Sequence, residues 1–169
     1  DLPPFPPRRS SDLHGRQGRL AACDEAIGLG NSGTSLRLLT AVAALVKGRS
    51  VLGGSERLKA RPIQDLIDGL SQLGVPARSL AGNGRPPVEI EGGAVRGGRA
   101  VLNCSLSSQF LSALLLIGPG TAEGIEVLVK GGPVSRPYID ITVEVMERFG
   151  VRVERRAYEW FKVPGLRAY

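Results

Sequence analysis

The feature that most constrains this fold is an internal repeat with a period near 75 residues. Arg61-Pro62 and Arg136-Pro137 lie 75 positions apart, and the segments that follow them end at Gly74-Val75 and Gly150-Val151. Proline favours the first turn of a helix, and glycine favours the position just after the last turn. Both segments are therefore predicted helices. A repeat on this scale predicts a fold made of two copies of one supersecondary unit.

A second pair of predicted helices precedes the first pair. Thr34 and Ser108 each stand in a small polar loop, and the loops lead into the mostly apolar runs LRLLTAVAALV and QFLSALLLIG. A helix that is apolar nearly all round is buried. Hydroxyl side chains in such loops are typical N-caps, so we expect Thr34 or a neighbour to cap one helix, and Ser107 or Ser108 the other.

Short β-prone segments bounded by glycine or proline fill the gaps between the predicted helices. The expected strands are Ser50–Gly53, Val88–Glu91, Arg99–Asn103, Ile125–Val129, Val151–Arg155 and Glu159–Val163. Together with the helices they give the order strand, buried helix, strand, second helix, strand, strand, present about twice. The expected fold class is therefore α/β (α+β), built by duplication of a βαβαββ unit.

Composition excludes several classes of protein. The chain has 169 residues, of which 42% are apolar and 22% charged, so it is not a disordered polypeptide. No run approaches the about 20 apolar residues of a membrane span. The two cysteines, Cys23 and Cys104, form no CxxC pair, and His14 is the only histidine. We therefore expect no metal site and no cofactor, and we expect both cysteines to be small buried residues.

The charge balance favours small anionic partners. Lysine and arginine number 22 against 16 acidic residues, which gives a net charge of +6. The arginines are scattered and aromatic residues make up only 5%, which argues against a nucleic-acid surface. Arg61 and Arg136 occupy the same place in the repeat, so with two helix N-termini they suggest one convergent site for carboxylate or phosphate. The alternative is that these residues only cap helices and meet solvent.

The first residues differ from the rest. Residues 1–13 read DLPPFPPRRSSDL, and four prolines within the first seven exclude a helix or a central strand there. We expect a leader that is either foreign to the protein or natively disordered, and a folded part that occupies residues 14–169.

Four segments carry a resemblance to a known family: LGNSGTSLRLL (Leu29–Leu39), RLKARPIQDLIDGLSQLG (Arg57–Gly74), SLSSQFLSALL (Ser105–Leu115) and SRPYIDITVEVMERFGV (Ser135–Val151). In order and spacing they resemble the N-terminal domain of the 5-enolpyruvylshikimate-3-phosphate synthase (EPSP synthase) family. That family has two similar domains, each with three βαβαββ units around a pseudo-threefold axis. The resemblance implies that residues 14–169 are a partial N-terminal domain, with about two of three units present and the second domain absent.

The resemblance also implies a reaction. The family transfers the enolpyruvyl group of phosphoenolpyruvate to the 5-hydroxyl of shikimate 3-phosphate and releases phosphate, on the path to chorismate. It implies small anionic substrates and a monomer at full length. The scattered arginines predict no nucleic-acid partner, the lack of a long apolar run predicts no membrane partner, and the lack of a signal or transit peptide predicts a cytoplasmic location. Three alternatives stay open: the sister enzyme that acts on UDP-N-acetylglucosamine, a non-catalytic anion-binding module, and a basic nucleic-acid binder.

Site residues follow from the same resemblance. It implies that shikimate 3-phosphate is held by Ser107, Ser108, Gln109, Ser135 and Tyr138. It implies that phosphoenolpyruvate is held by Asn31, Gly33, Thr34 and Arg61, with Gly33 leaving room for the ligand. The catalytic acid and base groups are expected in the missing domain, so we expect no turnover from this chain alone.

Overall fold

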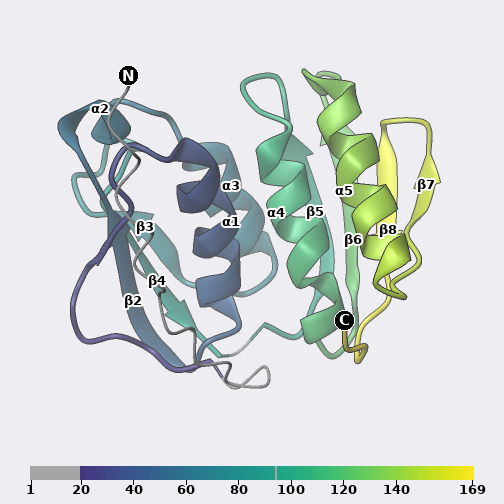
Figure 1. Ribbon diagram of the computed structural model, residues 1–169, viewed down its shortest axis with the longest axis horizontal. Coiled ribbons are helices and arrows are strands. Elements are labelled where there is room, and N and C mark those ends of the chain that lie inside the picture. The colour runs from purple at the N-terminus through teal and green to yellow at the C-terminus, as the bar shows by residue number, and fades with distance from the viewer. Residues whose placement is uncertain (1–19, 94) are drawn as a thin grey trace, which may run out of the picture.

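Two four-stranded sheets of identical topology make up the computed structural model, which describes residues 20–93 and 95–169 (Figure 1). The first sheet has the order β1-β2-β4-β3 and the second the order β5-β6-β8-β7. In each sheet the first two strands are parallel and the other pairs are antiparallel. The predicted leader and His14 lie outside the described residues.

Each sheet belongs to one βαβαββ unit. The first unit contains β1 (Ile27–Gly28), α1 (Gly33–Ala44), β2 (Gly48–Gly53), α2 (Glu56–Lys59), α3 (Gln64–Gln72), β3 (Ala77–Ser79) and β4 (Val88–Gly92). The second contains β5 (Gly98–Asn103), α4 (Gln109–Ile117), a 3-10 turn (Gly118–Gly120), β6 (Ile125–Lys130), α5 (Arg136–Arg148), β7 (Glu154–Arg156) and β8 (Trp160–Val163). The predicted fold class and the duplication are confirmed.

One predicted strand is wrong. Val151–Arg155 was expected to be extended, but the strand covers only Glu154–Arg156. The Val151 amide donates to the carbonyl of Met146 and so closes the end of α5, and the side chains of Val151 and Val153 are buried within a loop. The Val151 backbone amide therefore bonds to the end of the helix and does not pair with a neighbouring strand.

Three short elements have no counterpart among the predictions. Strands β1 and β3 contain two and three residues, too few to show an alternating pattern. Helix α2 has four residues, and the Ser55 hydroxyl caps it by accepting from the Leu58 amide at 3.3 Å. These elements depend on contacts with their neighbours more than on local sequence signals.

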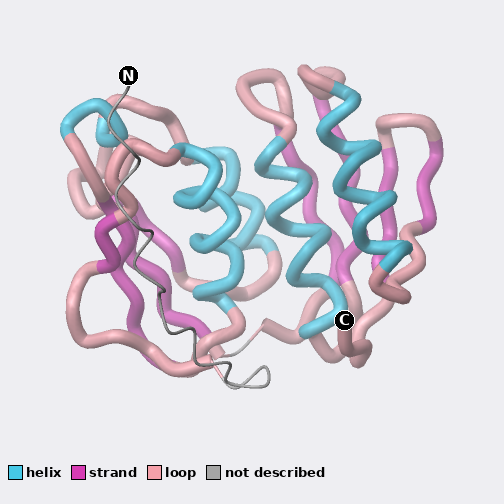
Figure 2. Tube along the Cα trace, viewed as in Figure 1, coloured by secondary structure: helices cyan, strands magenta, loops and turns pink. Residues whose placement is uncertain are grey.

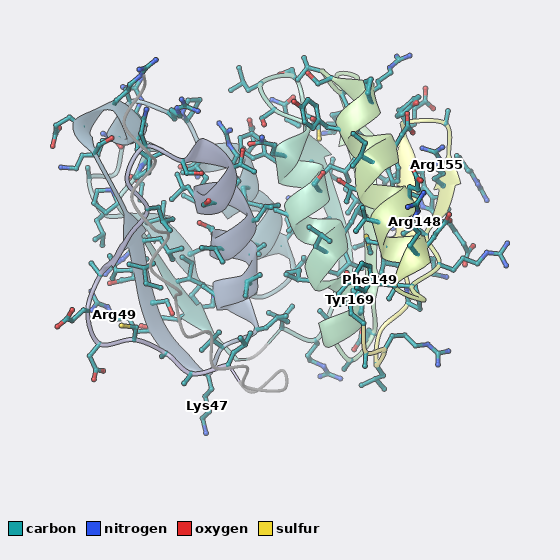
Figure 3. The ribbon with its side chains drawn as sticks, viewed as in Figure 1. Lys47, Arg49, Arg148, Phe149, Arg155 and Tyr169 are labelled. Carbon is teal, nitrogen blue, oxygen red and sulfur yellow. The ribbon has the colours of Figure 1, made fainter. Side chains whose placement is uncertain are left out.

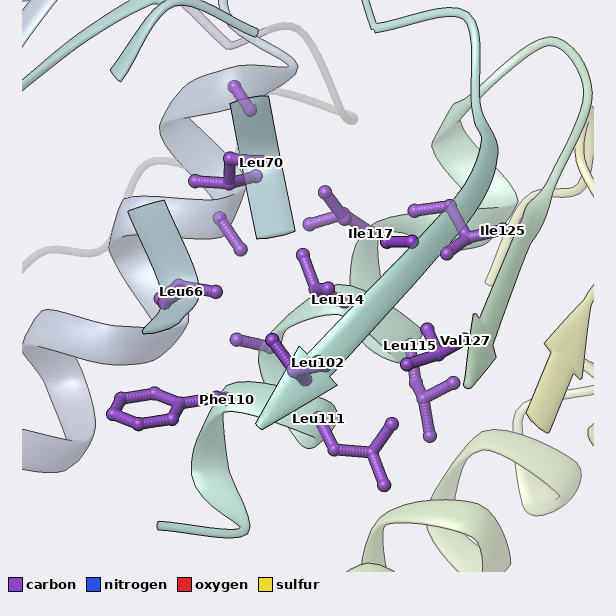
Figure 4. Close-up of a cluster of buried hydrophobic side chains, with 14 of the residues drawn as sticks. Leu66, Leu70, Leu102, Phe110, Leu111, Leu114, Leu115, Ile117, Ile125 and Val127 are labelled. Atoms are coloured by element: carbon purple, nitrogen blue, oxygen red, sulfur yellow. The ribbon is translucent and has the colours of Figure 1, made fainter. Parts of the chain in front are cut away.

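The core lies where the two units meet. Helices α1 and α4 stand side by side at the centre of the molecule, and α3 of the first unit packs on β5 of the second (Figures 1 and 2). Figure 4 shows the buried side chains at this junction, among them Leu66 of α3, Leu102 of β5 and Leu114 of α4. A Cβ at Gly69 would lie 3.1 Å from the side chains of both Leu102 and Leu114, so a glycine keeps α3 close to the second unit.

Charged side chains lie mainly outside this core, as Figure 3 shows for Arg49 and Arg155. Glu89 is little exposed but lies on the face of β4 opposite the core residues Val88 and Ile90. Its carboxylate pairs with Arg49 and with Arg78, each at 2.6 Å, and links three strands. Cys104 is buried as expected, and burial raises its thiol pKa to about 12. The same expectation is wrong for Cys23, which is exposed.

No helix in residues 20–93 and 95–169 is long and apolar enough to cross a membrane. Within those same residues, His, Cys, Asp and Glu side chains form no group of three that could hold a metal ion.

Candidate functional site

Helices α1, α4 and α5 begin at the same end of the molecule, the top in Figure 1. Each follows a strand of a parallel pair, which places the loops that lead into the helices at one edge. The Val134 amide donates to the carbonyl of Cys104 at 3.3 Å and joins two of these loops. We call the surface made by residues 29–34, 61, 104–109 and 131–138 the loop edge.

The start of α1 brings Ser32 into the role of N-cap. The Ser32 hydroxyl accepts from the Ser35 amide at 3.2 Å. Thr34 itself is therefore not the cap, and its exposed hydroxyl makes a different contact, with Gln109. Asn31 is exposed in the turn just before the helix.

Arg61 lies against the first residue of α1. A Cβ added to Gly33 would stand 2.6 Å from Arg61 Nη1 and 3.2 Å from Arg61 Cδ. The glycine thus lets the guanidinium approach a helix N-terminus, where backbone N–H groups also favour anions. The close neighbour of Gly33 in this structure is an arginine side chain of the same unit.

The start of α4 joins the two units through one amide side chain. Gln109 Nε2 donates to Thr34 Oγ1 at 2.9 Å, and Gln109 Oε1 accepts from Arg37 Nη1 at 2.7 Å. Ser107 and Ser108 precede Gln109 and are both buried. The Ser107 hydroxyl accepts from the backbone N–H of Gln109 at 3.2 Å. Ser108 occupies the N-cap position without a side-chain cap bond.

Arg37 is the residue that the sequence argument missed. Its guanidinium is half-buried and lies 5.3 Å from the centre of the Phe110 ring. Burial lowers the pKa of Arg37, and the positive charge of Arg61 lowers it further. A signal was available in the sequence, because Arg37 is the one charged residue in the otherwise apolar run LRLLTAVAALV.

The start of α5 holds Ser135 and Tyr138 outward. Ser135 has φ 52° and ψ 52°, a left-handed conformation that is strained for a residue other than glycine. Tyr138 is 60% exposed. Its carbonyl accepts from the Thr142 hydroxyl at 2.8 Å, and Thr142 in turn hydrogen-bonds the Ser112 hydroxyl of α4 at 2.7 Å. This chain of bonds fixes α5 to α4 next to the loop edge.

Arg136 departs from the expectation of two converging arginines. Its guanidinium lies 4.9 Å from the centre of the Tyr158 ring, in the loop between β7 and β8. Tyr158 donates to Asp140 at 2.8 Å, and Arg155 also pairs with that carboxylate, so hydrogen bonds hold the Asp140 pKa below its usual range. Arg136 therefore packs on the outer hairpin, and only Arg61 lies beside α1.

The loop edge gathers hydrogen-bond donors. Arg61, Gln109 and the amides that open α1 and α4 suit a carboxylate or a phosphate. The carboxylates of the described chain whose pKa is shifted, Glu89, Glu126 and Asp140, are all shifted downward by hydrogen bonds. None of those three has the raised pKa of a general acid. The arrangement fits anion binding better than proton transfer.

Comparisons with known proteins identify what this chain is similar to. A family model described as EPSP synthase (3-phosphoshikimate 1-carboxyvinyltransferase) matches residues 11–168. A 3-phosphoshikimate 1-carboxyvinyltransferase of Methanothermobacter thermautotrophicus is 51% identical over 142 residues, which is 84% of this chain and 33% of the relative. One from Actinobacillus pleuropneumoniae is 45% identical, over 85% of this chain and 34% of the relative.

Solved structures give the same result. An EPSP synthase from Acinetobacter baumannii superposes with a TM-score of 0.71 at 29% identity, covering 85% of this chain and 31% of the other. The chain thus spans about a third of the length of the relatives that it matches.

Proposed function

Since this chain belongs to the EPSP synthase (3-phosphoshikimate 1-carboxyvinyltransferase) family, we propose that it forms part of an enzyme that joins phosphoenolpyruvate to shikimate 3-phosphate. The 5-oxygen of shikimate 3-phosphate bonds to the enolpyruvyl carbon. The bond from that carbon to the phosphate oxygen breaks, and phosphate and the hydroxyl proton leave. The observation that carries the proposal is the junction at which Gln109 of one unit meets Thr34 of the other, close to Arg61.

We propose that the starts of α4 and α5 bind shikimate 3-phosphate. The hydroxyls of Ser107, Ser108 and Ser135 and the amide of Gln109 offer donors for its phosphate and its ring hydroxyls. A helix N-terminus adds a favourable field for the phosphate dianion. Tyr138 presents an exposed ring, which suits packing against the cyclohexene face.

We propose that the start of α1 binds phosphoenolpyruvate through Asn31, Gly33, Thr34 and Arg61. The planar guanidinium of Arg61 matches the two oxygens of a carboxylate or a phosphate. The approach of Arg61 to Gly33 puts that guanidinium next to the first free amides of α1. Two anionic substrates would then meet where the two units meet.

We propose that the remaining catalytic groups belong to a second domain outside this chain, because the chain spans about a third of its relatives. General acid and base groups must reach the reacting atoms directly. The isolated chain would then bind substrate without turnover. We further propose a monomeric cytoplasmic enzyme at full length, with small anionic substrates, no cofactor, and no nucleic-acid or membrane partner.

A chimera tests the proposal. Residues 27–163 would replace the matching third of the Methanothermobacter thermautotrophicus relative. We expect phosphate release that requires both phosphoenolpyruvate and shikimate 3-phosphate. Ser107→Ala should lower it, while Ser105→Ala, an exposed serine in the same loop, should not.

Two results would contradict the proposal. A folded chimera that released no phosphate would exclude a contribution of these units to the transferase. Turnover with UDP-N-acetylglucosamine in place of shikimate 3-phosphate would favour the sister enzyme.

A further inference from the structure

Arg37 contacts the proposed binding residue Gln109 and makes few other polar contacts within the described residues. Its Nη1 donates to Gln109 Oε1 at 2.7 Å, and its guanidinium faces the ring of Phe110. Its Nε is buried and finds no hydrogen-bond partner among the described residues. In residues 20–93 and 95–169 no carboxylate forms an ion pair with it. Gln109 is therefore the polar group on which Arg37 acts most directly.

This contact determines which way the Gln109 amide faces. An arginine can only donate hydrogen bonds, so the oxygen of the amide must face Arg37. The nitrogen then faces Thr34 and donates to its hydroxyl at 2.9 Å. If the amide were reversed, two donors would meet at Arg37, and a buried donor without an acceptor is costly.

The same logic extends to the groups beyond Gln109. An amide nitrogen carries two N–H bonds, and Thr34 takes one, so the second is left to donate. Because the Thr34 hydroxyl accepts from Gln109, its own proton is also left to donate. Arg61, near the N-terminus of α1, is likewise only a donor. Gln109, Thr34 and Arg61 thus each have a donor left for whatever binds there.

We propose that Arg37 is a positioning residue that fixes the hydrogen-bond direction of Gln109 and Thr34, so that Thr34 donates to the anionic group held at Arg61 while Gln109 keeps an N–H for the neighbouring substrate. The inference rests on the proposed function, since the anion is the phosphoenolpyruvate of that site. Arg37 acts through Gln109 and needs no contact with the ligand. It makes the junction of the two units selective for anions.

Three variants of the full chain separate this role from simple packing. Arg37→Met keeps an apolar stem over Phe110 and removes the donor. Arg37→Lys keeps a donor and a charge. Gln109→Glu keeps the pair with Arg37 but turns the side chain into an acceptor only, so Thr34 must donate to it and no N–H remains. Because the carboxylate of Gln109→Glu also repels an anion, Arg37→Met is the variant that separates the two roles: a packing role predicts little effect from it, whereas the proposed role predicts a loss of anion binding.

Nuclear magnetic resonance reads the amide direction without ligand. The contact to follow is the nuclear Overhauser effect between the Gln109 side-chain amide protons and the Thr34 methyl group. We expect it in the wild-type chain and in Arg37→Lys, and we expect it to weaken in Arg37→Met. An unchanged effect in Arg37→Met would overturn the inference whatever the ligand does.

Titration with phosphoenolpyruvate gives the second readout. We expect Arg37→Met to bind about tenfold more weakly than the wild type, the loss of one hydrogen bond to a charged group. Gln109→Glu should bind more weakly still, because its carboxylate also repels the anion. Arg37→Lys should recover most of the affinity. Equal affinity in the wild type and Arg37→Met would also overturn the inference. If the wild type bound nothing while the amide contact still depended on Arg37, the proposed function would fail and the positioning would stand.

Discussion

The two units share a topology but differ in how their second helices are buried. In α3 the large apolar side chains Leu66, Ile67 and Leu70 are all buried, because α3 packs on β5 of the other unit. In α5, Ile141 and Val145 occupy the repeat positions of Leu66 and Leu70 but are exposed, and so are Tyr138 and Phe149. The repeated sequence determines the topology of each unit, and the neighbouring unit determines which faces are covered.

The two Arg-Pro motifs are a second example of one repeated sequence that has different surroundings in the two units. Helix α5 begins at Arg136 itself, which directs that arginine to the Tyr158 ring. Helix α3 begins only at Gln64, so Arg61 stays in the preceding loop and reaches Gly33 of α1. One motif therefore supplies a packing residue in one unit and a candidate binding residue in the other.

The largest effect should come from the junction between the units. Leu114 is fully buried against the first unit, so Leu114→Ala should lower the free energy of unfolding by about 2–5 kcal/mol. The matched change Val145→Ala on the exposed face of α5 should cost less than about 0.5 kcal/mol. Urea denaturation measures both. Similar losses for the two variants would show that α5 is as well covered as α4.

The two arginines should differ next most strongly. Arg61→Met should weaken binding of phosphoenolpyruvate by about tenfold or more, since a charged hydrogen bond contributes about 1.5–3 kcal/mol. Arg136→Met should leave that affinity unchanged, because its guanidinium faces Tyr158. Calorimetric or fluorescence titration compares them. An equal loss in both variants would restore the convergent arrangement that the repeat alone suggests.

Gly33 tests how closely Arg61 must approach α1. In Gly33→Ala the new Cβ meets the end of a flexible side chain, so the arginine moves and the fold keeps its stability. We expect phosphoenolpyruvate to bind about fivefold more weakly, near the contribution of one ordinary hydrogen bond. Gly28→Ala has no atom within 4 Å of the new Cβ and serves as the control. Unchanged affinity in Gly33→Ala would separate Arg61 from the site.

The smallest effect concerns pH. Hydrogen bonds from Arg49 and Arg78 lower the pKa of Glu89. A carboxylate with a lowered folded pKa stabilises the fold above its unfolded pKa of about 4.3, and this contribution is lost as the pH falls through the folded value. Both arginines are exposed, so solvent weakens the pairs.

The measurement is the free energy of unfolding of Glu89→Gln and wild type at pH 7 and pH 3. The free energy of unfolding of Glu89→Gln should lie further below that of the wild type at pH 7 than at pH 3. Glu91→Gln, an exposed neighbour on the same strand, should show no such trend. A constant difference for Glu89→Gln would mean that its charge contributes nothing to stability.

The features that could be predicted from the sequence depend on short segments of the chain. Prolines and glycines predicted α3 and α5, and small polar loops before apolar runs predicted α1 and α4. The repeat predicted the shared topology, because these features act within one turn or one unit. The starts of α1, α4 and α5 were correctly located for the same reason, so most residues of the candidate site were named from sequence alone.

The features that could not be predicted depend on contacts between residues that are far apart in the sequence and close in the fold. The contact between Arg37 and Gln109 joins residues 72 positions apart, and it exists only because α1 packs on α4. The partner of Arg136 depends on where the β7–β8 loop folds back. The predicted strand Val151–Arg155 begins too early, because the Val151 amide donates to Met146 and closes the end of α5. The observed strand is Glu154–Arg156.

The central claim is that the two units jointly form one anion site at the loop edge. Mapping backbone amide chemical shifts during titration with phosphoenolpyruvate and shikimate 3-phosphate together tests it most directly. With both ligands present, we predict saturable changes that are largest at residues 31–34, 107–109 and 135–138 and therefore come from both units. Changes confined to one unit, or centred on the β7–β8 hairpin, would contradict the claim.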